Sequence, residues 1–161
     1  MMRILLLAAV LLLSACASQA PLPAHTPELA LPLQLHIQRK QAGQWQDWLL
    51  VLQREDAGLR WSLLDPLGIP LARQRLVDGQ WQADGLLPPN PEARELFAAL
   101  LFALAPASGL QDNYPAAQER SHQRTLGQRW RVDYRQPLDF DLELGTDLHY
   151  RIRLLNTGEH P

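Results

Sequence analysis

Only one cysteine, Cys16, occurs in the 161 residues of the chain. A single cysteine excludes an intramolecular disulfide, so the folded part must depend on its own hydrophobic core. Long apolar runs are also missing, since the run from Ile4 to Leu13 has ten residues. A helix needs about 20 apolar residues to cross a bilayer, so this run is too short for a permanent transmembrane anchor.

Catalytic and ligand-binding motifs are missing as well. None of the four serines that follow Cys16 lies in a Gly-x-Ser-x-Gly elbow, and no two histidines have the spacing of a metal-binding pair. No glycine-rich phosphate loop is present. We therefore predict a protein that is not an enzyme and that has no metal site and no cofactor.

The sequence has no excess of positive charge. Arg3 is the only charged residue among the first 15, so the remainder carries 14 Lys and Arg against 17 Asp and Glu. This balance argues against nucleic acid as a partner.

The N-terminus has the anatomy of an export signal, in which a basic residue precedes an apolar run. The run ends in Leu13-Ser14-Ala15-Cys16, which resembles the bacterial lipobox, where small residues precede a cysteine that receives a diacylglycerol. An ordinary signal peptide with a cysteine near its end by chance is the alternative. The position of the sole cysteine favours lipidation, so we predict a lipoprotein signal peptide over residues 1–15 and lipidation of Cys16.

The membrane that receives the anchor is predicted from the next residue. In enteric-type lipoproteins an aspartate after the cysteine retains the protein in the inner membrane, whereas this chain has Ala17. We therefore expect a periplasm-facing protein anchored in the outer membrane. Residues 16–31 contain three prolines among small and polar residues, which predicts a flexible tether between the anchor and the fold.

Residues 32–161 are predicted to form one domain that consists mainly of strands. Apolar residues alternate with polar ones around Leu33–Ile37 and Leu59–Leu63, and again between Trp130 and Leu154, and Trp48, Leu50 and Leu52 form a further set at the same spacing. The C-terminal strands are predicted to form an antiparallel meander with Arg, Asp and Glu on its outer face. Between these regions, Asn90-Pro91-Glu92 predicts a helix start and Pro106 its end.

The predicted helix is apolar nearly all round, and the predicted strands each have one apolar face with several aromatic residues. These side chains either fill a core or line a cavity for an acyl chain, and periodicity does not distinguish the two. The candidate cavity-lining residues are Leu35, Trp48, Leu50, Leu52, Trp61, Leu63, Leu96, Leu100, Trp130, Val132, Tyr134, Phe140 and Leu142.

Short motifs along the domain resemble the LolA/LolB family of lipoprotein carriers and receptors. The segment from Trp61 to Gly68, a strand that enters a Pro-Leu-Gly turn, is similar to the equivalent strand and turn of LolB. The segment from Leu126 to Tyr134 and the strands after it are similar to the C-terminal strands of LolB. The resemblance spans roughly residues 32–155, except that residues 78–124 depart from the pattern. The chain looks closer still to an uncharacterised relative family, often encoded beside aryl-polyene genes.

This resemblance implies an α+β fold that is mainly β: an open, curved antiparallel half-barrel closed by one or more apolar helices. It also implies an acyl-binding cavity, a membrane-inserting loop at Leu67 and Ile69, and a periplasmic LolA-like carrier as a partner. The function it implies is the delivery of acyl chains or another lipid-bearing cargo to the membrane. A docking subunit of an envelope assembly, with a filled core, is the alternative. A lipid-modifying hydrolase is disfavoured because no nucleophile is found.

Overall fold

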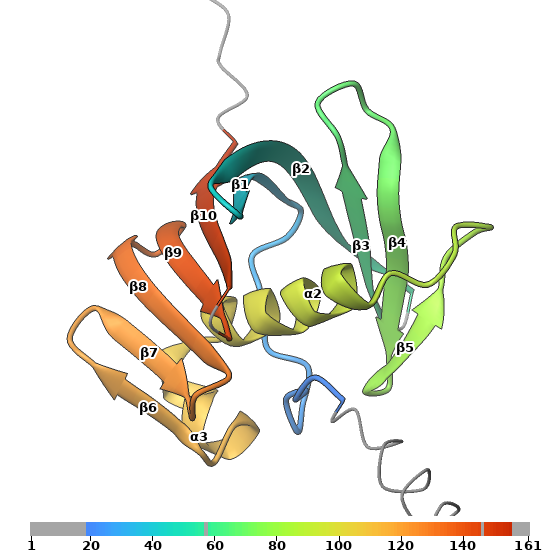
Figure 1. The fold of residues 1–161 in the computed structure, drawn as a ribbon. Helices are drawn as coiled ribbons and strands as arrows, with labels where there is room; N and C mark the ends of the chain where they lie inside the picture. The colour runs from blue at the N-terminus through green and yellow to red at the C-terminus, as the bar shows by residue number, and fades with distance from the viewer. Residues whose placement is uncertain (1–18, 57, 146, 156–161) are drawn as a thin grey trace, which may run out of the picture.

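A computed structural model describes residues 19–155 of the chain, apart from residues 57 and 146. Ten antiparallel strands form a single open sheet with the order β5-β4-β3-β2-β1-β10-β9-β8-β7-β6. The sheet curves around one long helix (Figure 1). The mainly β prediction is confirmed, and the open sheet is compatible with a curved half-barrel. The strands are β1 (Leu33–Gln41), β2 (Gln44–Glu55), β3 (Gly58–Leu64), β4 (Pro70–Val77), β5 (Gln80–Ala83), β6 (Ala117–Arg120), β7 (Gln123–Leu126), β8 (Trp130–Gln136), β9 (Asp139–Leu144) and β10 (Leu148–Leu154).

Two meanders, β1 to β5 and β6 to β10, meet where β1 pairs with β10. At this junction Ile37 lies opposite Ile152 on one side and Trp48 on the other. Side chains of alternating residues point to the concave face, so Leu35 and Ile37 of β1 are fully buried. The alternation predicted from the sequence is therefore confirmed in both halves of the sheet.

Helix α2 (Pro91–Leu104) lies across the concave face of the sheet (Figure 1). The side chain of Asn90 accepts a hydrogen bond from the backbone N–H of Ala93, and Pro91 occupies the first turn, as predicted. Every residue from Leu96 to Ala103 is buried. A helix that is apolar all round must be covered on more than one side, and the sheet covers only one of them.

The second cover of α2 is the segment of residues 19–31, which we call the strap. It crosses α2 before it enters β1 (blue in Figure 1). Pro27 is buried, and Ala20, Leu22, Leu29 and Leu31 pack against the core. This part of the predicted flexible tether therefore lies docked on the domain, because its apolar side chains cover an apolar helix.

Short elements between α2 and β8 were not predicted. A 3₁₀ turn, η1 (Ala107–Gly109), leads into α3 (Leu110–Asn113), and the hairpin of β6 and β7 follows. Among the residues that the structure describes, no single helix is long and apolar enough to cross a membrane. Only α2 taken together with Ala107–Asn113, at a bend of 103°, meets those criteria of length and composition.

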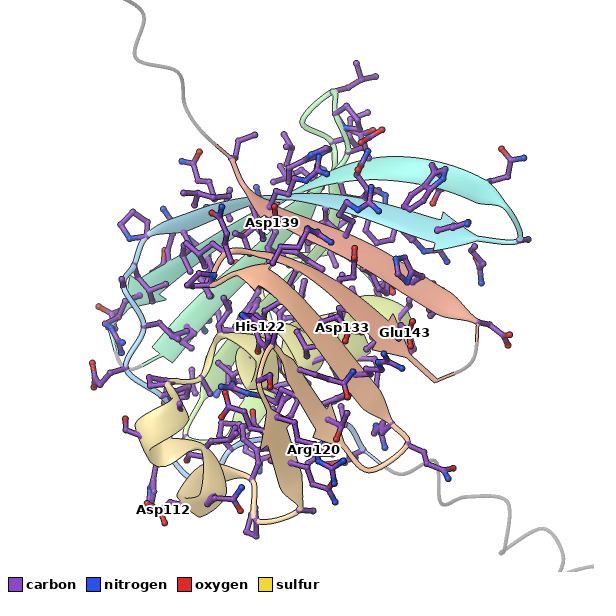
Figure 2. The ribbon with its side chains drawn as sticks, turned by 90° about the vertical axis from the view of Figure 1, so that its left-hand side faces the viewer. Asp112, Arg120, His122, Asp133, Asp139 and Glu143 are labelled. Atoms are coloured by element: carbon purple, nitrogen blue, oxygen red, sulfur yellow. The ribbon has the colours of Figure 1, made fainter. Side chains whose placement is uncertain are left out.

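The convex face of β8 to β10 carries the predicted mixture of Arg with Asp and Glu. Asp133, Asp139 and Glu143 mark this face in Figure 2. Arg135 pairs with Asp139 and Asp141, and the guanidinium of Arg151 lies 3.2 Å from Asp141. Such exposed pairs contribute about 0.2–1 kcal/mol each at most, so they select the register more than they stabilise the fold.

Candidate ligand-binding groove

The residues predicted to line a cavity lie mainly in a packed core. Eleven of the thirteen are at most 1 % exposed and belong to one continuous hydrophobic cluster that includes α2. The other two, Trp48 and Tyr134, are partly buried. In this structure α2 occupies the concave side of the sheet, so the core is filled there. A cavity-lining role for the eleven stays a prediction that requires α2 to move.

A groove lies beside this core, at the C-terminal end of α2. Its volume is about 680 Å³, within the range of ligand-binding pockets. Four parts of the chain form it: the strap, the start of β1, the end of α2, and the strands β6 to β8 with the turn after them. Of the predicted residues only Tyr134 lines it. The apolar lining residues are Leu29, Ala30, Leu33, Ala103, Leu104, Ala105, Pro106, Ala107, Pro137 and Leu138.

Arg124 of β7 forms part of the groove wall and is only 4 % exposed. Its Nη1 donates hydrogen bonds to the carbonyls of Phe102 and Ala105, each at 2.8 Å, and its Nη2 donates to Glu119 at 3.3 Å. The last turn of α2 contains no basic residue. Arg124 therefore supplies, from a distant strand, the positive charge and the donors that the carbonyl end of a helix needs.

Tyr134 of β8 also binds this end of α2. Its hydroxyl donates a hydrogen bond of 2.6 Å to the carbonyl of Ala103. Burial raises the pKa of Tyr134 to about 12, so the hydroxyl remains a donor at physiological pH. The Arg124 guanidinium lies 5.7 Å from the ring centroids of both Tyr134 and Phe102. The groove wall therefore contains one aromatic and one cationic side chain, Tyr134 and Arg124, beside its apolar residues.

The rim of the groove is polar. Glu28, Glu119, Ser121, His122, Arg135 and Gln136 surround the apolar lining and are exposed. Figure 2 shows His122 at the end of the β6–β7 hairpin, with Arg120 on the strand before it. Apolar walls with a polar rim suit an amphiphile, whose chain avoids water and whose head group does not.

The N-terminal half of α2 is held to the sheet by two buried or half-buried acidic networks. Glu95 accepts hydrogen bonds of 2.7 Å from the guanidinium of Arg129 and from the indole of Trp130. Burial alone raises the pKa of Glu95, but these hydrogen bonds outweigh it and the net pKa is lowered. Glu92 is held in the same way by Arg39 and Tyr150. Both ends of α2 are thus attached to the sheet by charged hydrogen bonds.

The loop between β3 and β4 exposes two apolar side chains. Leu67 is 85 % and Ile69 is 56 % exposed. The carboxylate of Asp65 accepts hydrogen bonds from the backbone N–H groups of both residues, at 2.9 and 2.8 Å. Gly68 has a φ of +82°, which favours glycine in this turn. The loop is held in place by its backbone while its apolar side chains face outward.

The groove brings together residues that the sequence pattern did not indicate. Arg124 occupies the same face of β7 as Leu126, so a charged residue at an apolar position of a strand was the available signal. Leu29 and Ala30 belong to a segment whose prolines suggested only a linker. Among residues 19–155, apart from the two undescribed positions, no group of His, Cys, Asp and Glu side chains is arranged to hold a metal ion.

Fold and groove together define a class of protein: an open antiparallel sheet wrapped around one buried helix, with an amphiphilic groove at the end of that helix. The chain belongs to the family described as "Protein of unknown function (DUF3261)", whose model matches residues 32–154. The expectation of an uncharacterised family agrees with this match, and a link to LolA and LolB stays a prediction. A search of curated protein sequences found no match.

Proposed function

We propose that this protein is an outer-membrane lipoprotein, anchored through Cys16, that binds the acyl chain of a lipid-bearing cargo and delivers it to the membrane. The observation that carries the proposal is the groove of about 680 Å³ with its apolar walls and polar rim. Burying a dozen methylenes contributes roughly 10 kcal/mol at about 0.8 kcal/mol each, before ordering costs. A micromolar Kd requires about 8 kcal/mol, so the groove needs only part of a long chain.

Kinship with LolA and LolB, and a periplasmic LolA-like carrier as donor of the cargo, belong to the same proposal. The ordered loop that exposes Leu67 supports it, because an apolar loop tip suits insertion into a bilayer. The proposed activity is non-enzymatic and requires no cofactor.

A direct binding measurement tests the groove. Residues 17–161 contain every element that the structure describes, and this chain is expected to bind a fluorescent long-chain fatty acid at low micromolar concentration. Leu138→Glu places a carboxylate on the apolar wall and is expected to weaken binding about tenfold, or about 1.4 kcal/mol. Leu86→Glu is the matched control, because Leu86 is fully exposed and lies outside the groove.

Native mass spectrometry of the same chain, purified without detergent, is expected to show a co-purified acyl lipid. A stable protein that binds no acyl probe and carries no lipid would contradict the proposal. The unliganded groove would then be only a surface depression.

The exposed loop is tested separately, through transfer of a bound acyl probe from the protein to phospholipid vesicles. Leu67→Glu is expected to leave folding and probe binding unchanged but to slow transfer about tenfold, because a charge on the tip opposes insertion. Leu86→Glu again serves as the control for an added carboxylate on an exposed loop. Equal transfer rates for Leu67→Glu and the wild type would show that Leu67 is only a turn residue.

A second candidate function, a docking subunit of an envelope assembly, is favoured by the filled core around α2. A filled core needs no ligand and leaves the outer surface as the functional part. Absence of acyl binding, together with recovery of a stable protein complex from the envelope, would favour this candidate.

A further inference from the structure

Helix α2 has two apolar faces, and the chain covers them by different means. The sheet covers one face with long strands, hydrogen bonds and the charged attachments at Glu92 and Glu95. The strap covers the other face with a segment that forms no helix or strand within its described residues 19–31. The strap therefore covers α2 without the strands, hydrogen bonds and charged attachments by which the sheet covers it.

Few polar contacts hold the strap in place. The backbone N–H of Ala24 donates to the carbonyl of Asn113 at 3.3 Å, and the N–H of His25 donates to the side chain of Asn113 at 2.8 Å. The remaining contacts described for the strap are apolar, from Leu22, Leu29 and others that pack on the core. An acyl chain offers the same kind of contact, so it can substitute for the strap without leaving polar groups of α2 unpaired.

The strap also separates two hollows that lie at opposite ends of α2. Leu29 and Ala30 form a wall of the groove at the C-terminal end. Ala20 and Leu22 form a wall of a second cleft, of about 340 Å³, beside Pro91 and Arg94 at the N-terminal end. Figure 1 shows the strap crossing α2 between the two ends of the helix. Removing the strap would join the groove and the cleft into one trough along the helix.

The length of this trough fits an acyl chain. Helix α2 has 14 residues, which corresponds to about 21 Å at 1.5 Å per residue. One leaflet of a bilayer has a hydrocarbon thickness of about 15 Å, so an acyl chain of ordinary length fits along the helix.

We propose that the strap is the intramolecular occupant of the acyl site, and that a cargo chain binds along α2 in its place. The proposal rests on the acyl-binding function proposed above and locates the site on the outer face of α2, away from the sheet. The groove at Leu104 and Leu138 is the open end of this site, where a chain enters before it displaces the strap.

A reversible crosslink tests the proposal. The backbones of Ala24 and Asn113 are joined by a hydrogen bond of 3.3 Å, so we expect a disulfide to form on oxidation of the Ala24→Cys/Asn113→Cys variant of residues 17–161, which contains no other cysteine. The reduced form lacks the hydrogen bond from His25 to the Asn113 side chain, so it is expected to bind a fluorescent long-chain fatty acid at least as tightly as the wild type. The oxidised form is expected to bind at least tenfold more weakly than the reduced form. The reduced form of this variant is the matched control for the oxidised form, because the two differ only in the disulfide.

A second variant acts in the opposite direction. Pro27 is buried in the strap and lines neither hollow, so Pro27→Ser loosens the strap without removing a wall residue. We expect severalfold tighter probe binding, because a weaker internal competitor is displaced more easily.

The outcomes separate the two proposals. Equal binding by the oxidised and reduced forms would overturn the strap proposal while leaving acyl binding in the groove intact. Absence of binding by the wild type and by the reduced form would overturn the proposed function, and the strap proposal with it.

Discussion

Replacing Arg124 with methionine is expected to lower the free energy of unfolding by about 3 kcal/mol. The Arg124 side chain is almost fully buried and donates hydrogen bonds to carbonyls at the end of α2. Methionine keeps much of the apolar stem but leaves these carbonyls and the nearby Glu119 without their cation. A loss of this size is a large part of the 5–15 kcal/mol that typically stabilises a domain.

Urea unfolding followed by tryptophan emission measures the change. The midpoint is expected to fall while the slope of the transition stays the same, which indicates altered stability with an unaltered amount of buried surface. Arg120→Met is the matched control, since Arg120 lies on the paired strand of the same hairpin and is exposed. An equal midpoint shift for Arg120→Met and Arg124→Met would show that the hydrogen bonds from Arg124 to α2 do not add to the free energy of unfolding.

Replacing Cys16 with serine is expected to abolish lipid attachment altogether. Serine has no thiol to form the thioether, and the chain has no other cysteine that could accept the diacylglycerol. Cys16 itself lies outside the described residues, so this prediction depends on the lipobox alone. Metabolic labelling with palmitate, followed by cell fractionation, measures both the modification and the membrane association.

The expected result is complete loss of label and loss of stable membrane anchoring, because stable anchoring requires more than one buried acyl chain and the variant would carry none. Ser18→Ala, two residues downstream and outside the lipobox, should keep both. Palmitate label on the Cys16→Ser protein would contradict the lipoprotein hypothesis and the predicted outer-membrane location.

Local rules predicted the parts of the fold that local sequence determines. The cap at Asn90 and the proline at Pro91 specify a helix start by their own chemistry, and the structure confirms both. Alternating apolar residues such as Leu35 and Ile37 predict a strand with one buried face, which is also confirmed. The ion pairs on the convex face follow from the same alternation.

The rest depends on neighbours that lie far away in the sequence. Strands β6 and β7 have four residues each and are mostly polar, so they contain too little pattern to be detected. The burial of Arg124 is explained only once the carbonyl end of α2 lies beside it. Periodicity also placed Leu50 and Trp61 on the inner face of the sheet. It did not indicate that α2 packs against this face and fills the concave side.

If Cys16 carries the predicted lipid anchor, the position of the strap limits how the domain can be oriented on a membrane. Gln19 lines the same cleft as Gly79, in the turn that follows β4, while Leu67 precedes β4 at its other end. The eight residues of β4 separate the two sites by about 26 Å.

With the strap docked, an anchor at Cys16 reaches at most about 11 Å from Gln19, so the loop tip touches the same bilayer only if the domain lies along its β4–β5 edge. With the strap released, the chain from Cys16 to Pro32 spans up to about 55 Å, and the domain can turn upright to present Leu67. Whether the strap or an acyl chain covers α2 would thereby set the tilt of the domain and the distance that it reaches from its anchor.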